Sequence, residues 1–194
     1  FKDSFTKSGG NIVSFLSYQQ DQKDFSTFIK GIKDKGAEVL FIADITRETM
    51  LSILKEISAQ KLNIKIVSAD SWDGLSKYTD FNYDAYYTAG YHVEDTSPLT
   101  KKFTDDFTAK YGKAPMSYGA FGYDAANIMF QAIKNANSLE SSAIINELSK
   151  INYNGATGEL KFDENRNPIR SLTILKDLGK GEVKFFKKLA PSGK

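Results

Sequence analysis

The chain has 194 residues, of which 41% are hydrophobic and 26% charged, so it is long enough to bury a core. Its formal net charge of +2 gives no reason to expect binding to nucleic acid or to an acidic membrane surface. The absence of cysteine excludes disulfides, thiolate metal sites and cysteine nucleophiles.

The first ten residues have the pattern of a helix end. Phe1 and Phe5 are four positions apart, and Gly9 and Gly10 follow, which is typical of the last turns of an amphipathic helix and its C-cap. Because this helix begins in mid-pattern, we expect the sequence to be a fragment. Any signal peptide, lipid anchor or first domain would lie upstream of Phe1.

Strand and helix patterns alternate through the first half of the chain. Apolar strand patterns cover residues 11–18, 39–42 and 64–67, and amphipathic helix patterns lie between them at 24–35 and 46–57. Strands separated by helices of this length indicate a parallel sheet joined by right-handed crossovers. The predicted fold class is therefore α/β, with a parallel sheet flanked by helices.

The second half has a different pattern. A strand at 85–89 leads into the polar, proline-containing stretch 91–98, which we interpret as a crossing between domains. Helix patterns follow at 99–111, from Tyr118 to Ile133 and at 143–148. Strand patterns at 159–162, 171–175 and 183–187 complete the chain.

Polar and aromatic residues follow the second and third strands. The run from Ile64 to Val67 stops before Asp70 and Trp72, and the run ending at Ile42 stops before Asp44 and Thr46. Open α/β folds bind ligands in the crevice beyond the carboxyl ends of parallel strands, so these residues are candidates for a binding site.

Each candidate also has a purely structural interpretation. Asp70 has the position of a helix N-cap over residues 72–75, and Asp44 that of a solvated loop acid beside an N-cap at Thr46. Trp72 is suited either to form an apolar wall or to pack under the loop. His92 has no second ligand at metal spacing, and residues 163–165 lack the glycine and glutamate of a calcium loop, so neither predicts a metal site.

Seven short motifs occur in the order and spacing of a known family. The chain resembles the type I periplasmic solute-binding proteins, and most closely the branched-chain amino-acid receptors of ABC transporters. The motifs are Ser8-Gly9-Gly10, Lys23-Asp24-Phe25-Ser26, Asp70-Ser71-Trp72, Lys110-Tyr111-Gly112, Gly122-Tyr123-Asp124-Ala125, Gly155-Ala156-Thr157-Gly158 and residues 162–168.

This resemblance implies the C-terminal part of a two-lobed protein that closes on a ligand by a hinge. Residues 1–94 would form the second-lobe ligand-binding domain, 95–168 an incomplete returning segment of the first lobe, and 169–194 a return to the second lobe. Most of the first lobe, with the donors for the ligand's carboxylate, would lie upstream, so this chain alone would bind poorly.

The resemblance also implies roles for individual residues. Asp70 matches the acid that takes the ammonium group of an amino-acid ligand, and such a buried ammonium needs an ionised partner. Thr46 stands where the family often has tyrosine, and the loop 44–47 departs from the usual form, which leaves the ligand open. Tyr118 and Tyr123 would face the pocket from the first lobe, with core packing as the alternative.

The expected partners follow from the same resemblance. They are an amino-acid ligand and the permease of an ABC importer, outside the cell or in the periplasm, with no cofactor and no reaction catalysed. Truncated apolar surfaces would favour a homodimer.

Three other classes of protein are alternatives to a solute-binding protein. An α/β enzyme is disfavoured because the sequence has no Gly-rich phosphate loop, no G-x-S-x-G elbow and no paired His and acid motif. A flavodoxin-like or receiver-like module lacks its phosphate loop or phosphoacceptor. The sensory domain of a membrane receptor would share the fold, and only flanking sequence would distinguish it.

Overall fold

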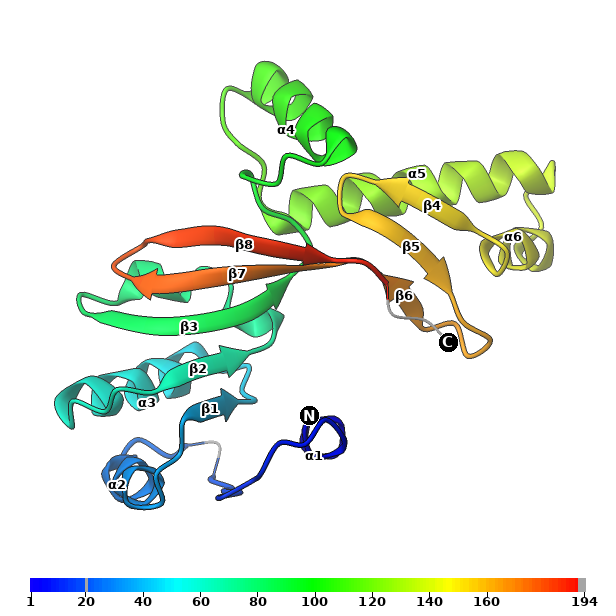
Figure 1. The fold of residues 1–194 in the computed structure, drawn as a ribbon. Coiled ribbons are helices and arrows are strands. Elements are labelled where there is room, and N and C mark those ends of the chain that lie inside the picture. The colour runs from blue at the N-terminus through cyan, green and yellow to red at the C-terminus, as the bar shows by residue number, and fades with distance from the viewer. Residues whose placement is uncertain (20, 192–194) are drawn as a thin grey trace. The chain divides into compact units, whose positions relative to one another are not determined.

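The computed structural model describes residues 1–19 and 21–191. The chain divides into two compact units (Figure 1). The first comprises Phe1–Tyr87 and Lys176–Val183, and the second comprises Thr88–Leu175 and the residues from Lys184 onward.

Three parallel strands organise the first unit. β1 (Val39–Ile42) pairs with β2 (Lys65–Ser68), and β2 pairs with β3 (Asn82–Ala89), both in parallel. Helix α2 (Ser26–Asp34) precedes β1, and helix α3 (Arg47–Ala59) connects β1 to β2. Both helices lie beside these strands (Figure 1). The predicted α/β class with a parallel sheet is therefore confirmed.

The apolar faces of these elements form the core of the first unit. α2 buries Ile29 and Ile32, and Ile66 of β2 is fully buried. α3 buries a stripe at helical spacing made of Met50, Ile53, Leu54 and Ile57. Burying each such side chain contributes about 1.5–3 kcal/mol, so this contact holds the two helices against the strands.

The N-terminal segment agrees with its prediction only in part. α1 (Lys2–Lys7) ends in a Schellman motif, in which Gly10 N–H donates to Phe5 O at 2.9 Å and Gly9 N–H to Thr6 O at 3.0 Å. Gly9 has φ +88°, a conformation that favours glycine. The predicted strand at 11–18 is wrong, because residues 11–19 have no regular secondary structure.

Two further strands complete the larger sheet, whose order is β1-β2-β3-β7-β8. β7 (Leu172–Gly179) and β8 (Val183–Leu189) are joined by a tight turn, so they run antiparallel and make the sheet mixed. Gly179 at this turn has φ +81°, and a Cβ there would lie 2.2 Å from Phe81 O. Along the chain, strands β3 and β8 pass from the first unit into the second, and β7 passes from the second into the first.

The second unit contains three helices and a small sheet in the described part of the chain. The helices are α4 (Pro98–Tyr111), α5 (Ser117–Ala136) and α6 (Ser141–Leu148). The antiparallel sheet has the order β4-β5-β6, formed by Asn152–Gly155, Gly158–Phe162 and Pro168–Arg170. None of the described helices is long and apolar enough to cross a membrane.

Candidate ligand-binding site

The loops after β1 and β2 meet at one edge of the sheet. Ile42 and Ser68 are partners in the register, and Ser68 Oγ donates to Ile42 O at 2.9 Å. Beyond the strand ends, Ser71 Oγ donates to Asp44 O at 2.6 Å, which joins the two loops. The structure therefore brings Asp44, Thr46 and the loop of Asp70 to the carboxyl edge that the sequence indicated.

Asp70 is exposed and begins the short 3-10 helix η1 (Asp70–Trp72). The flanking cap position belongs to Ala69, and within the described residues the Asp70 carboxylate has no hydrogen-bond partner. The capping interpretation of Asp70 is therefore wrong. Its carboxylate is open to a cationic group of a ligand.

Asp44 is half-buried, and both of its carboxylate oxygens are engaged. Oδ1 accepts Thr46 N–H at 2.5 Å, and Oδ2 accepts the Tyr18 hydroxyl at 2.5 Å. Burial and this carboxylate raise the pKa of Tyr18 above its ordinary value. Thr46 occupies the N-cap position of α3, but its side chain makes no capping hydrogen bond. Asp44 thus orders the loop rather than presenting a free charge.

Trp72 is fully buried beneath the loop, so it presents no surface to solvent. Its Nε1 donates to Asp177 Oδ2 at 3.1 Å, and its ring packs edge-on against Tyr83 with centroids 6.2 Å apart. The interpretation that Trp72 packs under the loop is therefore confirmed. Trp72 holds the loop of Asp70 in place.

Asp177 is a residue that sequence reasoning missed. Its side chain is fully buried at the end of β7, where it also accepts the Tyr83 hydroxyl and Gly179 N–H, both at 2.9 Å. Burial raises the pKa of this carboxyl, although the three hydrogen bonds oppose the shift. The alternation of residues along β7 could have revealed Asp177, because Thr173, Leu175 and Asp177 lie on the same, buried side of the strand.

Tyr118 belongs to the first turn of α5 in the second unit and is 81% exposed. Core packing of Tyr118 is therefore wrong. Tyr123, one turn further along α5, is 50% exposed and packs with its ring centroid 4.9 Å from that of Phe103. Tyr118 is thus free to contact a ligand or partner, whereas Tyr123 is partly engaged.

Asp124 anchors α5 to the turn between β4 and β5. Its Oδ2 accepts Thr157 N–H and the Thr157 hydroxyl, both at 2.7 Å. Its Oδ1 accepts Ala156 N–H at 2.9 Å and the Tyr153 hydroxyl at 3.0 Å. This carboxylate is buried and saturated with donors, so it is structural.

The described residues do not group into a metal site. No cluster of three or more metal-ligating side chains occurs in residues 1–19 and 21–191. His92 Nδ1 lies 3.8 Å from Glu94 Oε2, and it accepts Glu94 N–H at 3.3 Å. What the geometry describes is an α/β binding module with one accessible carboxylate at the end of a parallel strand.

Comparison with known proteins agrees with this class. The family model described as periplasmic binding protein matches residues 1–180, and the chain belongs to that family. Membership confirms the expectation that the chain belongs to a family of binding proteins rather than enzymes. It also confirms the resemblance on which the predicted site was based.

Among curated proteins, Leu/Ile/Val-binding protein homolog 7 of Brucella abortus is 23% identical over 88% of this chain. This alignment covers 46% of the relative, so the chain spans about half the length of the curated relatives it matches.

Solved structures share the fold. The leucine-binding protein LivK of Thermotoga maritima has a TM-score of 0.79 and 25% identity, over 98% of this chain and 55% of that one. LivJ of Streptococcus pneumoniae, in complex with isoleucine, has a TM-score of 0.76 and 22% identity over 98% and 56%. A solute-binding protein from R. palustris in complex with benzoate has 0.73 and 17% over 98% and 54%.

Proposed function

We propose that this chain is part of the solute receptor of an ABC importer, that it acts outside the cell or in the periplasm, and that its ligand is a branched-chain or similar amino acid. Asp70 is the group that takes the ligand's ammonium. The observation that carries this assignment is its exposed carboxylate, free of partners among the described residues, at the carboxyl end of β2.

The same proposal assigns the chain to two lobes. Residues 1–94 and 169–194 belong to one lobe, and residues 95–168 belong to the other. The neighbouring Asp44 and Thr46 form the rim of the pocket, and Tyr118 is a further residue assigned to the ligand site. The receptor delivers its ligand to the permease of the importer.

The charge of Asp70 bears on the choice of ligand. One structural relative binds isoleucine, which carries an ammonium group, and another binds benzoate, which carries none. A free carboxylate attracts the first kind of ligand and repels the second. The sequence around β2 therefore favours an amino acid over an aromatic acid.

Calorimetry on the longer protein tests this function, with leucine, isoleucine, valine and benzoate as probes. We expect at least one branched-chain amino acid to bind and benzoate not to bind. Asp70→Ala should weaken the binding by roughly a hundredfold to a thousandfold, because removing one partner of a buried ion pair costs about 3–5 kcal/mol. Asp80→Asn, which neutralises another exposed acid of the same unit, is the matched control and should bind as the parent does. Binding of benzoate alone would refute the proposal.

A further inference from the structure

Two acids leave the larger sheet at matching positions. Ile42 of β1 and Ser68 of β2 are partners in the register, and Asp44 and Asp70 each lie two residues beyond them. Neighbouring strands lie about 4.8 Å apart, and the bond from Ser71 Oγ to Asp44 O keeps the two loops together. A ligand with two cationic groups would therefore meet two carboxylates at this edge.

Of these two acids, Asp70 is open and Asp44 is engaged. Asp70 is exposed, and its carboxylate has no hydrogen-bond partner in residues 1–19 and 21–191. Asp44 accepts Thr46 N–H at Oδ1, a bond within one loop, and the Tyr18 hydroxyl at Oδ2. The bond from Tyr18 spans 26 positions of sequence, so the state of Asp44 depends on a distant part of the chain.

The ring of Tyr18 is held where its hydroxyl meets Asp44. It packs edge-on against Phe25, which is buried at the start of α2, with ring centroids 5.2 Å apart. Burial and the Asp44 carboxylate raise the pKa of the Tyr18 hydroxyl, so the hydroxyl stays protonated and remains a donor at neutral pH. Tyr18 thus keeps one oxygen of Asp44 covered.

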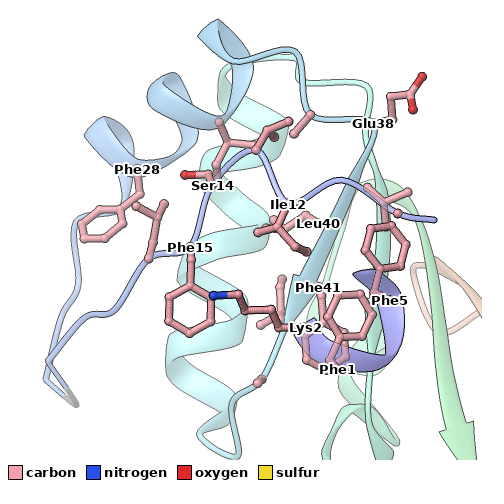
Figure 2. Close-up of a pocket in the computed structure, with 18 of the residues that line it drawn as sticks. Phe1, Lys2, Phe5, Ile12, Ser14, Phe15, Phe28, Glu38, Leu40 and Phe41 are labelled. Carbon is pink, nitrogen blue, oxygen red and sulfur yellow. The ribbon is translucent and has the colours of Figure 1, made fainter. Parts of the chain in front are cut away.

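The contact joins the last residues of two segments that line a cavity of about 980 Å³ (Figure 2). The segments are residues 9–18 and 36–44, and Figure 2 shows Phe15 of the first and Phe41 of the second beside this cavity. The first segment contains no helix or strand, so no strand pairing holds Tyr18 in place. The hydroxyl can therefore be removed without breaking a sheet.

Resting on the proposed function, in which Asp70 takes the ligand's α-ammonium, we propose that Tyr18 sets the class of ligand by occupying Asp44. The site then binds amino acids with an uncharged side chain and excludes those, such as lysine, that carry a second ammonium. A second ammonium would leave water for a carboxylate that already has its donors, so the cost of its desolvation is not offset. Tyr18 acts through Asp44 and need not touch the ligand.

Calorimetry on the longer protein with norleucine and lysine tests the proposal, because the two differ only in the terminal ammonium of lysine. We expect the parent to bind norleucine more tightly. Tyr18→Phe keeps the ring but frees Asp44 Oδ2, and a hydrogen bond to a charged group is worth roughly tenfold to a hundredfold in affinity. Lysine affinity should therefore rise at least about tenfold, while norleucine affinity changes less than about threefold. An unchanged ratio of the two affinities would overturn the proposal.

Two further variants show whether the gain in lysine affinity comes from Asp44. Tyr18→Phe combined with Asp44→Asn should lose the gain, because no carboxylate is freed. Tyr78→Phe removes the hydroxyl of an exposed tyrosine in the same unit and should keep the ratio of the parent. A gain that persists in the double variant would overturn the proposal, since it would not pass through Asp44.

The parent protein alone gives a test that needs no variant to fold. Lysine binding as tight as that of norleucine, or tighter, would mean that Asp44 does not exclude the second ammonium, and would overturn the proposal. Leucine separates a failure here from a failure of the proposed function. If the parent binds leucine but its selectivity does not depend on Tyr18, the function stands without this inference, whereas no binding of leucine would overturn both.

Discussion

Trp72 donates its indole N–H to the Asp177 carboxylate at 3.1 Å across 105 positions of sequence. Both side chains are fully buried. The bond ties η1, which begins with Asp70, to the end of β7. The accessible carboxylate of Asp70 is therefore presented by a loop whose underside is fixed.

Removing the Asp177 carboxylate should loosen this loop. Asp177→Ala leaves the Trp72 N–H, the Tyr83 hydroxyl and the Gly179 N–H without an acceptor, at about 1–3 kcal/mol for each buried donor. The free energy of unfolding should fall by that amount in urea denaturation. Trp72 is the only tryptophan, so its fluorescence emission reports the site directly and should shift to longer wavelength. An unchanged emission maximum would show that the loop does not depend on this bond.

The raised pKa of Asp177 gives a pH dependence of defined sign. Because burial raises its pKa in the folded state, the folded protein binds more protons than the unfolded one above about pH 3.9, the ordinary value for Asp. The free energy of unfolding then falls as pH rises from there through the folded pKa. Asp177→Asn cannot ionise, so the stability of the parent relative to this variant should decline over that interval. Parallel pH profiles would contradict the assignment.

Asp95 and Lys188 form a largely buried ion pair in the second unit, with Nζ 2.7 Å from Oδ2. Burial opposes ionisation of Asp95, but the bonds from Lys188 and Ser97 outweigh it and lower its pKa. Lys188→Met should cost about 3–5 kcal/mol at neutral pH by leaving the carboxylate unpaired. The difference from the parent should be present above about pH 3.9 and disappear as pH falls through the folded pKa. Denaturation midpoints at several pH values measure it, and a constant difference would count against the pairing.

Asp124, the one acidic residue of α5, should be sensitive to substitution. Asp124→Asn keeps the shape but turns an amide toward either Thr157 or Ala156, whose N–H groups need an acceptor. The expected loss is about 1–3 kcal/mol. Tyr153→Phe, which removes a single hydroxyl bond to the same carboxylate, is the matched control and should cost about 1 kcal/mol. Equal stability of Asp124→Asn and the parent would mean that this anchor is dispensable.

Asp44 should matter less to ligand affinity than Asp70. In Asp44→Asn the amide oxygen can still accept Thr46 N–H, and the amide nitrogen can donate to the Tyr18 hydroxyl, which accepts as well as donates. We expect leucine affinity of the longer protein to change less than about tenfold. A loss equal to that of Asp70→Asn in the same calorimetry would make Asp44 a direct ligand contact.

The sequence predicts an element best where the chain itself contains what the element packs on. The runs 39–42 and 64–67 became β1 and β2 because each pairs with a neighbour, and α3 buried the stripe that its spacing indicated. Residues 11–18 have the same composition but no adjacent strand, and the predicted strand did not form. Composition reports the propensity for a strand, whereas pairing requires a partner.

The candidate site was predictable in position but not in function. Parallel strands put Asp44 and Asp70 at one edge whatever their role, but which of the two is free depends on partners distant in sequence. Tyr18 and Thr46 donate hydrogen bonds to the Asp44 carboxylate, while the Asp70 carboxylate has no partner in the described residues. Tyr118 shows the same limit, since a tyrosine near the start of a helix is compatible with either core or surface.

The pairing of Asp70 with a ligand ammonium is tested most directly by comparing leucine with 4-methylpentanoate, which lacks only the ammonium group. Calorimetry on the longer protein should find leucine the tighter ligand. Asp70→Asn should weaken leucine by roughly a hundredfold to a thousandfold, equivalent to about 3–5 kcal/mol. It should leave the binding of 4-methylpentanoate unchanged or make it tighter, because the variant no longer repels the ligand's carboxylate. An equal loss for both compounds, or no loss for leucine, would contradict the role of Asp70.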